Sequence, residues 1–391
     1  MKISHIVFVL FTCLSVVSYG ESFSSWKKSF QKQAIKEGVR PEFMETVWPN
    51  VEELSKVVKS DRRQSEQVLD IYKYTSRVLT KKRIQDGKKL YREHGALLNR
   101  IYKKYNIAPQ YLLALWGAET SYGTYKGSTN TLNALATLAY DKRRRDFFSK
   151  ELIAFLKILD ENKLEDVQGS WAGAFGNFQF MPRTFQAYGV DEDGDGRKDI
   201  LHSIEDSFGS AANYLHKMGW TDHMRWGRQV VLSKYLTKEK RLGKKTVKEW
   251  AALGVIPADG TSWGQSGLIV PAELKLPMGV MGPAFLAYPN FNVLMKWNKS
   301  TLYAITIGLL ADQIAEHGTG LIPFKKRKGL TSYEIACVQE TLLDAGYSIG
   351  KVDGVLGKKT AEALQNFALQ KELPQGCISK EFMKDFHQLK F

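Results

Sequence analysis

The stretch from Tyr111 to Tyr140 constrains the fold most, because it sets one acidic residue into an otherwise apolar helical pattern. Apolar side chains recur at helical spacing until Glu119, so the segment before it is expected to be a core helix. Gly123 and Gly127 follow closely and are expected to end this helix or to open the next loop. The sequence therefore predicts a carboxyl group at the end of a buried helix.

Burial of Glu119 against aromatic rings such as Trp116 and Tyr122 would raise the pKa of its carboxyl group, since burial disfavours the charged form. A carboxylic acid that keeps its proton near neutral pH can protonate a leaving oxygen, as a general acid does. A single glutamate on a helix is more often a solvated surface residue. This stretch alone does not decide between the two interpretations.

The length and the first residues place the chain among exported globular proteins. It has 391 residues, 43% of them hydrophobic and 12% aromatic, which allows two or three domains with a sizeable core. Residues 1–20 carry Lys2, then an apolar run, then small residues, the pattern of a secretory signal peptide. Cys13 fits a lipoprotein signal poorly and is taken as part of this leader. No later stretch reaches the roughly 18 apolar residues of a membrane span.

The formal net charge of +15 makes the chain strongly basic. A basic exported protein favours anionic partners such as a cell-wall polymer, a phospholipid surface or nucleic acid, and composition does not choose among them. Two cysteines, Cys337 and Cys377, remain after the leader, and an oxidising compartment would allow them to pair. No CxxC or His-rich spacing indicates zinc.

Flanking segments indicate a helical scaffold with a small sheet. Residues 21–110 carry apolar positions three and four apart, which predicts scaffold helices, and Asn106 and Pro109 then break the pattern. Residues 221–289 alternate charged helical runs with β-branched segments such as RQVVL and GLIVP, which predicts a small β region.

Residues 141–159 are expected to form another helix, which directs Phe147, Phe148 and Phe155 inward. The arginine run from Arg143 to Arg145 stands at its start. We expect these arginines to be a solvated helix end.

The segment SWAGAFGNFQFMPRTFQAYG, residues 170–189, combines glycines, neutral polar groups and aromatic rings. Gly173 and Gly176 allow a backbone to approach a ligand closely. Hydrogen-bonding side chains stand among the aromatic rings: Ser170, Asn177 and Gln179. Such a mixture suits a sugar, although a tight glycine turn between core elements explains the pattern about as well.

Five motifs follow one another over roughly residues 30–320. They are WGAETSYG, TLNALATLAYD, AGAFGNFQFMP, the D-x-D-G-D-G loop and NFNVLMKWNKSTLYA. Together they resemble the membrane-bound lytic murein transglycosylase B family. The resemblance implies a mainly α, lysozyme-like catalytic domain with a small β region, which we place at residues 21–322.

The resemblance assigns the family's single catalytic acid to Glu119. The expected substrate-binding residues, including Tyr122 beside the acid, are Tyr74, Tyr122, Ser170, Gln179, Trp297, Asn298 and Tyr303. Where the family more usually has tyrosine before the asparagine, this chain has Trp297. We therefore expect an aromatic face for stacking at Trp297 and infer no hydrogen bond there.

The implied reaction is cleavage of the β-1,4 bond between N-acetylmuramic acid and N-acetylglucosamine in peptidoglycan. Glu119 would first protonate the glycosidic oxygen and then activate the sugar's own 6-hydroxyl, giving a 1,6-anhydromuramoyl end, without a second carboxylate. Asp141, Asp146 and Glu151 remain candidates for a second acid. A muramidase, which transfers the sugar to water, and a non-enzymatic wall-binding or scaffold protein are the alternatives.

The same resemblance sets the expected partners and compartment. We expect peptidoglycan glycan strands as the partner, no nucleic acid and no organic cofactor, in a periplasmic protein that is soluble or associated with the cell wall. We also expect a monomer, and an association with cell-wall machinery is left open.

An acidic loop resembles the calcium loop of helix–loop–helix proteins. Asp191, Asp193 and Asp195 occupy positions 1, 3 and 5, and Gly196 occupies position 6. The backbone carbonyl of Arg197 would supply position 7. We expect a structural calcium ion here, and an acidic turn that binds no metal is the alternative.

Position 12 of this loop departs from the pattern, because His202 replaces the usual glutamate. Glu205 or Asp206 could complete the calcium shell instead. The family resemblance favours Asp206.

A short basic segment, residues 323–329, is expected to link the catalytic domain to a C-terminal module. Residues 330–391 resemble the peptidoglycan-binding domain type 1 family. The matching residues are Val338-Gln339, Leu342, Gly346-Tyr347, Gly350, Asp353-Gly354, Gly357, Thr360, Ala363-Leu364 and Phe367. Three apolar stripes predict a three-helix module, which a bond between Cys337 and Cys377 could staple. A plain structural module is the alternative.

Overall fold

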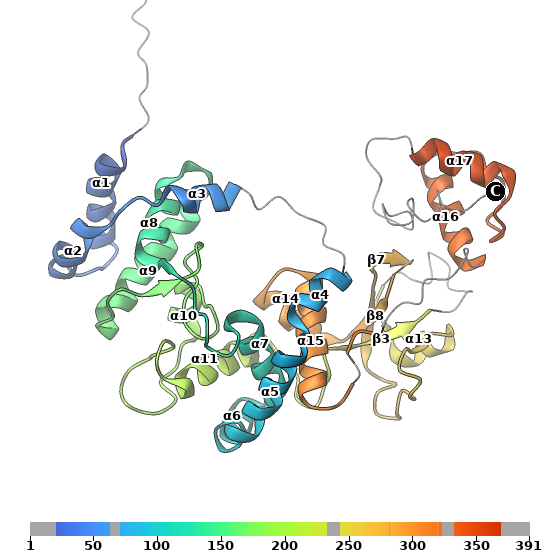
Figure 1. Cartoon of the computed structure of the whole chain (residues 1–391), viewed down its shortest axis with the longest axis horizontal. Helices are drawn as coiled ribbons and strands as arrows, with labels where there is room; N and C mark the ends of the chain where they lie inside the picture. The colour runs from blue at the N-terminus through green and yellow to red at the C-terminus, as the bar shows by residue number, and fades with distance from the viewer. Residues whose placement is uncertain are drawn as a thin grey trace, which may run out of the picture.

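The structure is a computed structural model that describes residues 21–62, 71–232, 243–280, 282–318, 320–322 and 332–368. The fold is mainly helical, as predicted, with small sheets (Figure 1). The expected signal peptide, the basic linker and the end of the C-terminal module lie outside the described residues. Among the helices that are described, none has the length and apolar character to cross a membrane.

Short helices precede the central one. They are α1 (Phe23–Lys36), α2 (Pro41–Val47), α3 (Ser55–Arg62), α4 (Ile71–Val78), α5 (Lys81–Glu93) and α6 (Gly95–Tyr105), with a 3₁₀ turn at Trp48–Asn50. The side chains of Ser22 and Thr80 accept backbone hydrogen bonds at the starts of α1 and α5, which satisfies open N–H groups there. Asn106 ends α6 in the left-handed conformation, at the predicted break.

The central helix α7 (Pro109–Thr120) is buried on nearly every side, because its apolar residues cover the whole surface of the helix rather than one stripe. Pro109 occupies its first turn, and Ser121 ends it with a φ of 50°. Gly123 and Gly127 lie in the following loop with positive φ values, as the sequence predicts. Helices α5, α6, α11 (Ile204–Lys217) and α15 (Thr301–Ile314) pack around α7.

A second group of helices lies against this centre and includes α3. It consists of α8 (Thr131–Tyr140), a 3₁₀ turn at Lys142–Arg144, α9 (Arg145–Asn162) and α10 (Pro182–Tyr188). The strands β1 (Thr129–Asn130), just before α8, and β2 (Gln168–Gly169), after α9, pair in an antiparallel two-stranded ladder. The long helices α8 and α9 run side by side in Figure 1.

One expectation for the start of α9 is wrong, and another is incomplete. Arg143 and Arg144 are exposed, as expected for a solvated helix end, but their guanidinium groups also pair with Asp61 of α3, whose side chain is 3% exposed. A buried carboxylate needs such partners to offset its lost hydration. Phe147 points outward and is 39% exposed, with the guanidinium of Arg144 over its ring, and the buried stripe begins instead at Phe148.

The predicted β region is an antiparallel five-stranded sheet in the order β4-β6-β8-β3-β5. Its strands are β3 (Gly227–Val231), β4 (Lys245–Thr246), β5 (Ile256–Pro257), β6 (Pro271–Lys275) and β8 (Ala284–Ala287), with β7 (Pro277–Val280) nearby and α13 (Val247–Ala252) packed on it. RQVVL forms β3 as predicted. GLIVP does not form a strand before Pro271, because its Leu268 and Val270 N–H groups bond within a local turn.

The described part of the C-terminal module consists of α16 (Ser332–Asp344) and α17 (Lys358–Ala368). Apolar residues from the two helices form their common core: Val338, Leu342, Leu364 and Phe367. The third predicted helix lies outside the described residues. Cys337 is buried and disulfide-bonded, and Cys377, its expected partner, also lies outside them.

Candidate active site

Glu119 lies in the last turn of α7, half-buried, and two aromatic side chains donate hydrogen bonds to the same oxygen of its carboxyl group. The hydroxyl of Tyr303 and the indole N–H of Trp297 both donate to Oε1, the indole at 3.2 Å. Tyr303 belongs to the first turn of α15, and Trp297 is the last residue of α14 (Pro289–Trp297). Among the described residues none donates a hydrogen bond to Oε2.

Burial raises the pKa of Glu119, and the hydrogen bonds from Tyr303 and Trp297 oppose that shift. The direction agrees with the sequence prediction. The carboxyl group therefore retains its proton to a higher pH than an exposed glutamate does. Once it is ionised, the two hydrogen-bond donors stabilise the anion.

Trp116 and Tyr122 do not bury Glu119 in the way that the sequence suggests. The ring of Tyr122 packs over Gly117, and its hydroxyl donates to the backbone carbonyl of Arg83 at 2.7 Å. Trp116 packs edge-on against Tyr122. Because residues 117 and 119 lie about 200° apart around a helix, this packing fastens the opposite side of α7 to α5.

Two tyrosines share the surroundings of the acid. Tyr303 is 7% exposed, and burial together with the charge of Glu119 raises the pKa of its phenol well above the usual value, so it remains a hydrogen-bond donor. Tyr74 on α4 is half-buried, and burial and then the charge of Glu119 raise the pKa of its phenol. The structure therefore brings Tyr74, which lies far upstream in the sequence, to the same site.

Ser170 and Gln179 lie on the glycine-rich loop between β2 and α10. The hydroxyl oxygen of Ser170 accepts hydrogen bonds from the N–H groups of Ala172 and Ala174 at 3.3 and 3.0 Å, which leaves its proton for another acceptor. The Gln179 side-chain N–H₂ donates to the carbonyl of Lys126 at 2.9 Å in the loop that follows α7. Both side chains are half-buried, and Gln179 connects its loop to the loop that follows α7.

Asn298 and Trp297 differ in their surroundings. Asn298 is exposed and ends α14. Trp297 supplies the hydrogen bond to Glu119 that the sequence interpretation did not infer at this position. The replacement of tyrosine by tryptophan was the available signal, since an indole N–H is a donor just as a phenol is.

None of the three candidates for a second acid is bonded to Glu119 in the described structure. Glu151 is 3% exposed and accepts the backbone N–H of Arg183 at 2.9 Å. Asp141 caps the turn after α8, and Asp146 is exposed in the first turn of α9. The position of each of these carboxylates is therefore explained by a structural role at a helix end or in a buried turn.

Asn177 is a buried connector rather than the sugar-binding group that its motif suggested. It is 4% exposed, and its amide donates to Ser207 at 2.9 Å and to the carbonyl of Ile200 at 3.3 Å. Its side-chain oxygen accepts the indole N–H of Trp116 at 3.4 Å, and its backbone carbonyl accepts the hydroxyl of Thr120. A hydrogen-bonded path thus joins the end of the acidic loop to the last turn of α7.

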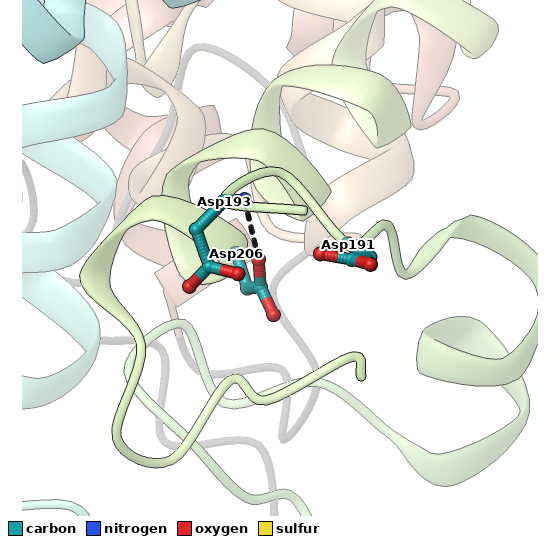
Figure 2. A group of neighbouring side chains, drawn as sticks. All are labelled: Asp191, Asp193 and Asp206. Atoms are coloured by element: carbon teal, nitrogen blue, oxygen red, sulfur yellow. Dashed lines mark hydrogen bonds between the residues drawn. The ribbon is translucent and has the colours of Figure 1, made fainter. Parts of the chain in front are cut away.

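The acidic loop brings three of its predicted ligands together. Oxygen atoms of Asp191, Asp193 and Asp206 lie within 4.8 Å of one another (Figure 2). Asp206, fully buried at the start of α11, accepts the backbone N–H groups of Glu192, Asp193 and Asp199. Burial, the largest cause, raises the pKa of Asp206.

Asp195 and Arg197 are exposed and lie outside this group of three. The carboxylate of Asp195 accepts the backbone N–H of Arg197 at 2.8 Å. Gly194 and Gly196 have φ values of 79° and 87°, which a loop that turns its carboxylates to one side requires. Three clustered carboxylates of this kind are the hard oxygen donors that suit calcium.

Glu192, between the first two aspartates, was not singled out in the sequence. Its side chain is 2% exposed and accepts hydrogen bonds from Lys104 and Tyr105 of α6 at 2.9 and 2.8 Å. It thereby anchors the acidic loop to the helix that precedes α7.

Comparison with known proteins identifies the family of the chain. Residues 22–312 match the family described as Transglycosylase SLT domain. Membrane-bound lytic murein transglycosylase B of Escherichia coli (strain K12) is 31% identical over 250 residues, which cover 62% of this chain and 67% of that protein.

Two solved structures are also similar. SltB3 from Pseudomonas aeruginosa, in complex with NAG-anhNAM-pentapeptide, superposes with a TM-score of 0.75 and 33% identity, covering 94% of this chain and all of that one. The Escherichia coli lytic transglycosylase Slt35 in complex with calcium gives a TM-score of 0.64 and 25% identity, over 79% of this chain and 99% of that one. The chain therefore belongs to the transglycosylase SLT domain family and is a lytic murein transglycosylase.

Proposed function

We propose that Glu119 is the single acid and base for cleavage of the β-1,4 bond between N-acetylmuramic acid and N-acetylglucosamine in peptidoglycan. The observation that carries the proposal is the half-buried carboxyl group with a raised pKa and two donors on one oxygen. An acid whose pKa is raised by burial keeps its proton to higher pH than an exposed glutamate, and the two donors stabilise it once ionised, so it suits both halves of the reaction.

The reaction needs no second protein carboxylate when the substrate supplies its own nucleophiles. Glu119 gives its proton to the glycosidic oxygen as the bond to the anomeric carbon breaks, and the muramoyl N-acetyl oxygen stabilises that carbon. Glu119, now a carboxylate, takes the proton of the 6-hydroxyl as that oxygen bonds to the anomeric carbon. The proton count balances, and the products are a free 4-hydroxyl and a 1,6-anhydromuramoyl end.

Four further side chains are proposed to contact the glycan: Tyr74, Ser170, Gln179 and Asn298. Ser170 retains a hydroxyl proton to donate, and Tyr74 shares the electrostatic surroundings of Glu119. The NAG-anhNAM-pentapeptide bound to SltB3 of Pseudomonas aeruginosa supports the same class of product here. Tyr122 is proposed to act through the packing of α7 onto α5.

The test is Glu119→Gln, because the amide is nearly isosteric but neither gives nor retrieves a proton. We expect a folded protein, by circular dichroism, that releases no anhydromuropeptides from purified sacculi. Sustained release by the folded variant would remove Glu119 from this role. A muramidase would release reducing ends instead.

We further propose that calcium binds at Asp191, Asp193 and Asp206, with Asp195 and the backbone carbonyl of Arg197 completing the shell. The clustering of the three carboxylates supports this site, as does the calcium in the Escherichia coli Slt35 structure. The ion would neutralise the clustered charge and stiffen the loop. It would stay outside the chemistry, although the path through Asn177 connects the loop to α7.

The C-terminal module is proposed to bind peptidoglycan, after export to the periplasm directed by residues 1–20. Support comes from Gln339, whose side-chain oxygen accepts the N–H groups of Asp353 and Gly354 at 3.0 and 2.9 Å. These three residues, which match the peptidoglycan-binding domain type 1 family, therefore contact one another at one loop. Val352 and Val355 on that loop are 41% and 61% exposed, which leaves apolar surface for a ligand.

A further inference from the structure

Trp297 is held firmly in place by its neighbours. The rings of Phe178, Phe180 and Tyr214 lie 6.3, 5.2 and 5.1 Å from its indole, measured between ring centroids. The hydroxyl of Tyr214 donates separately to the backbone carbonyl of Lys296 at 2.8 Å, a bond that is not among the ring contacts that hold the indole. The indole N–H is therefore preorganised, and the catalytic acid accepts its hydrogen bond.

We propose that Trp297 is a positioning residue that makes Oε2 of Glu119 the oxygen that gives and takes the proton. Trp297 and Tyr303 both donate to Oε1, so Oε1 already has two hydrogen bonds and is the poorer site for a proton. The described structure gives Oε2 no donor. The inference rests on the proposed role of Glu119 and adds which oxygen acts and which residue selects it.

The two donors matter most when Glu119 has lost its proton. Negative charge then develops on the carboxylate, and hydrogen bonds to a charged acceptor are stronger than those to a neutral one. Because the indole is already in place, stabilising the anion requires no rearrangement at the moment of reaction. Trp297 thus lowers the barrier through Glu119, without a contact to the sugar.

The competing role for Trp297 is the one that the sequence suggested, a stacking platform for a sugar ring. A platform contributes chiefly to substrate binding, so its loss raises KM. A positioning donor contributes after substrate is bound, so its loss lowers kcat and shifts the pH dependence. Kinetics of one conservative variant therefore separate the two roles.

The experiment compares wild type, Trp297→Phe and Tyr214→Phe on short soluble peptidoglycan strands across a pH series. For Trp297→Phe we expect kcat to fall by about tenfold or more, as for loss of one hydrogen bond to a charged group. KM should stay within about twofold. The alkaline limb of kcat/KM should move to higher pH, since losing a donor to the carboxylate raises the pKa of Glu119 and keeps the acid protonated longer.

Tyr214→Phe is the matched control, because it removes a hydrogen bond to α14 but keeps the ring against Trp297. It should lower the melting temperature and leave the alkaline limb in place. If Trp297→Phe does not fold, site-specific 3-benzothienylalanine at position 297 replaces the N–H with sulfur at nearly constant shape, and the same shift is expected.

A rise in KM with unchanged kcat and an unmoved alkaline limb would overturn the inference and make Trp297 a platform. Glu119→Gln serves as the reference for the proposed function. If that variant stays active, the role of Glu119 fails. If it is inactive while the limb of Trp297→Phe does not shift, only the role of Trp297 fails.

Discussion

Tyr303 donates its phenolic hydrogen bond to Oε1 of Glu119, a residue 184 positions earlier in the chain. The bond exists only because α15 packs along α7. Folding of these two apolar helices therefore assembles the acid and its donor together, and the high pKa of the buried phenol keeps the donor protonated.

Replacing Tyr303 with phenylalanine should lower kcat by about tenfold or more, as for other donors to a developing anion. The alkaline limb of kcat/KM should move to higher pH, because the lost hydrogen bond stabilised the ionised form of Glu119. Release of anhydromuropeptides, measured across a pH series, tests both effects.

Tyr105→Phe is the control for that variant. Its hydroxyl also donates to a carboxylate, that of Glu192 at 2.8 Å, but in the anchor of the acidic loop. It should leave the pH dependence in place. Equal shifts in the two variants would mean that the effect does not arise from contact with Glu119.

Glu119→Gln should stabilise the fold at neutral pH. Burial raises the pKa of Glu119 in the folded state, so the folded protein binds this proton more tightly than the unfolded chain does. The stability that follows is complete below the unfolded pKa and is lost as pH rises through the folded pKa. The melting temperature of the variant should therefore exceed that of wild type at neutral pH, by roughly 2–4 °C for each kcal/mol gained in the free energy of unfolding.

In acid the two melting temperatures should converge, because wild type regains its proton there. A difference that instead grows on acidification would show that the folded pKa of Glu119 is depressed. Differential scanning fluorimetry over a pH series is sufficient for this comparison.

Calcium added to metal-free protein should raise the melting temperature. At a calcium concentration one hundred times Kd, the free energy of unfolding should increase by about 2.7 kcal/mol. Asp206→Asn should remove this gain, since Asp206 belongs to the carboxylate cluster. Asp160→Asn, which loses only an ion pair with Arg40, should retain it. Identical melting curves of wild type with calcium and with chelator would count against the site.

Truncation after Ile322 should weaken activity on insoluble sacculi much more than on short soluble muropeptides. The reason is that a separate binding module raises the local concentration of substrate without taking part in the chemistry. Rates on the two substrates, measured for the full chain and the truncated one, give the comparison. Equal losses on both would make the module part of the catalytic architecture.

The sequence was sufficient to predict the helix that carries Glu119, because its apolar spacing, Pro109 and the following glycines are local signals. Family motifs then predicted the other site residues, and the structure brings Tyr303 and Tyr74 to the acid. The hydrogen bond of Trp297 could not be predicted, since it depends on how α14 meets α7 across 178 residues.

The contacts that the sequence analysis missed at Arg143 and Asn177 have a common cause. Both residues were judged from their own segments, but their partners come from elsewhere in the chain. Asp61 pairs with Arg143 from 82 residues earlier, and Asn177 donates to Ile200 of the acidic loop and to Ser207 of α11. Local periodicity predicts which face of a helix is apolar, and it does not predict which polar groups meet in the folded protein.

The origin of the oxygen in the products tests the central claim most directly. Sacculi digested by the purified enzyme in water enriched in ¹⁸O would be analysed by mass spectrometry. Attack by the sugar's own 6-hydroxyl predicts anhydro products without ¹⁸O, each lighter by one water than a reducing end. One ¹⁸O atom in the reducing end of each released muropeptide would show hydrolysis and contradict the account.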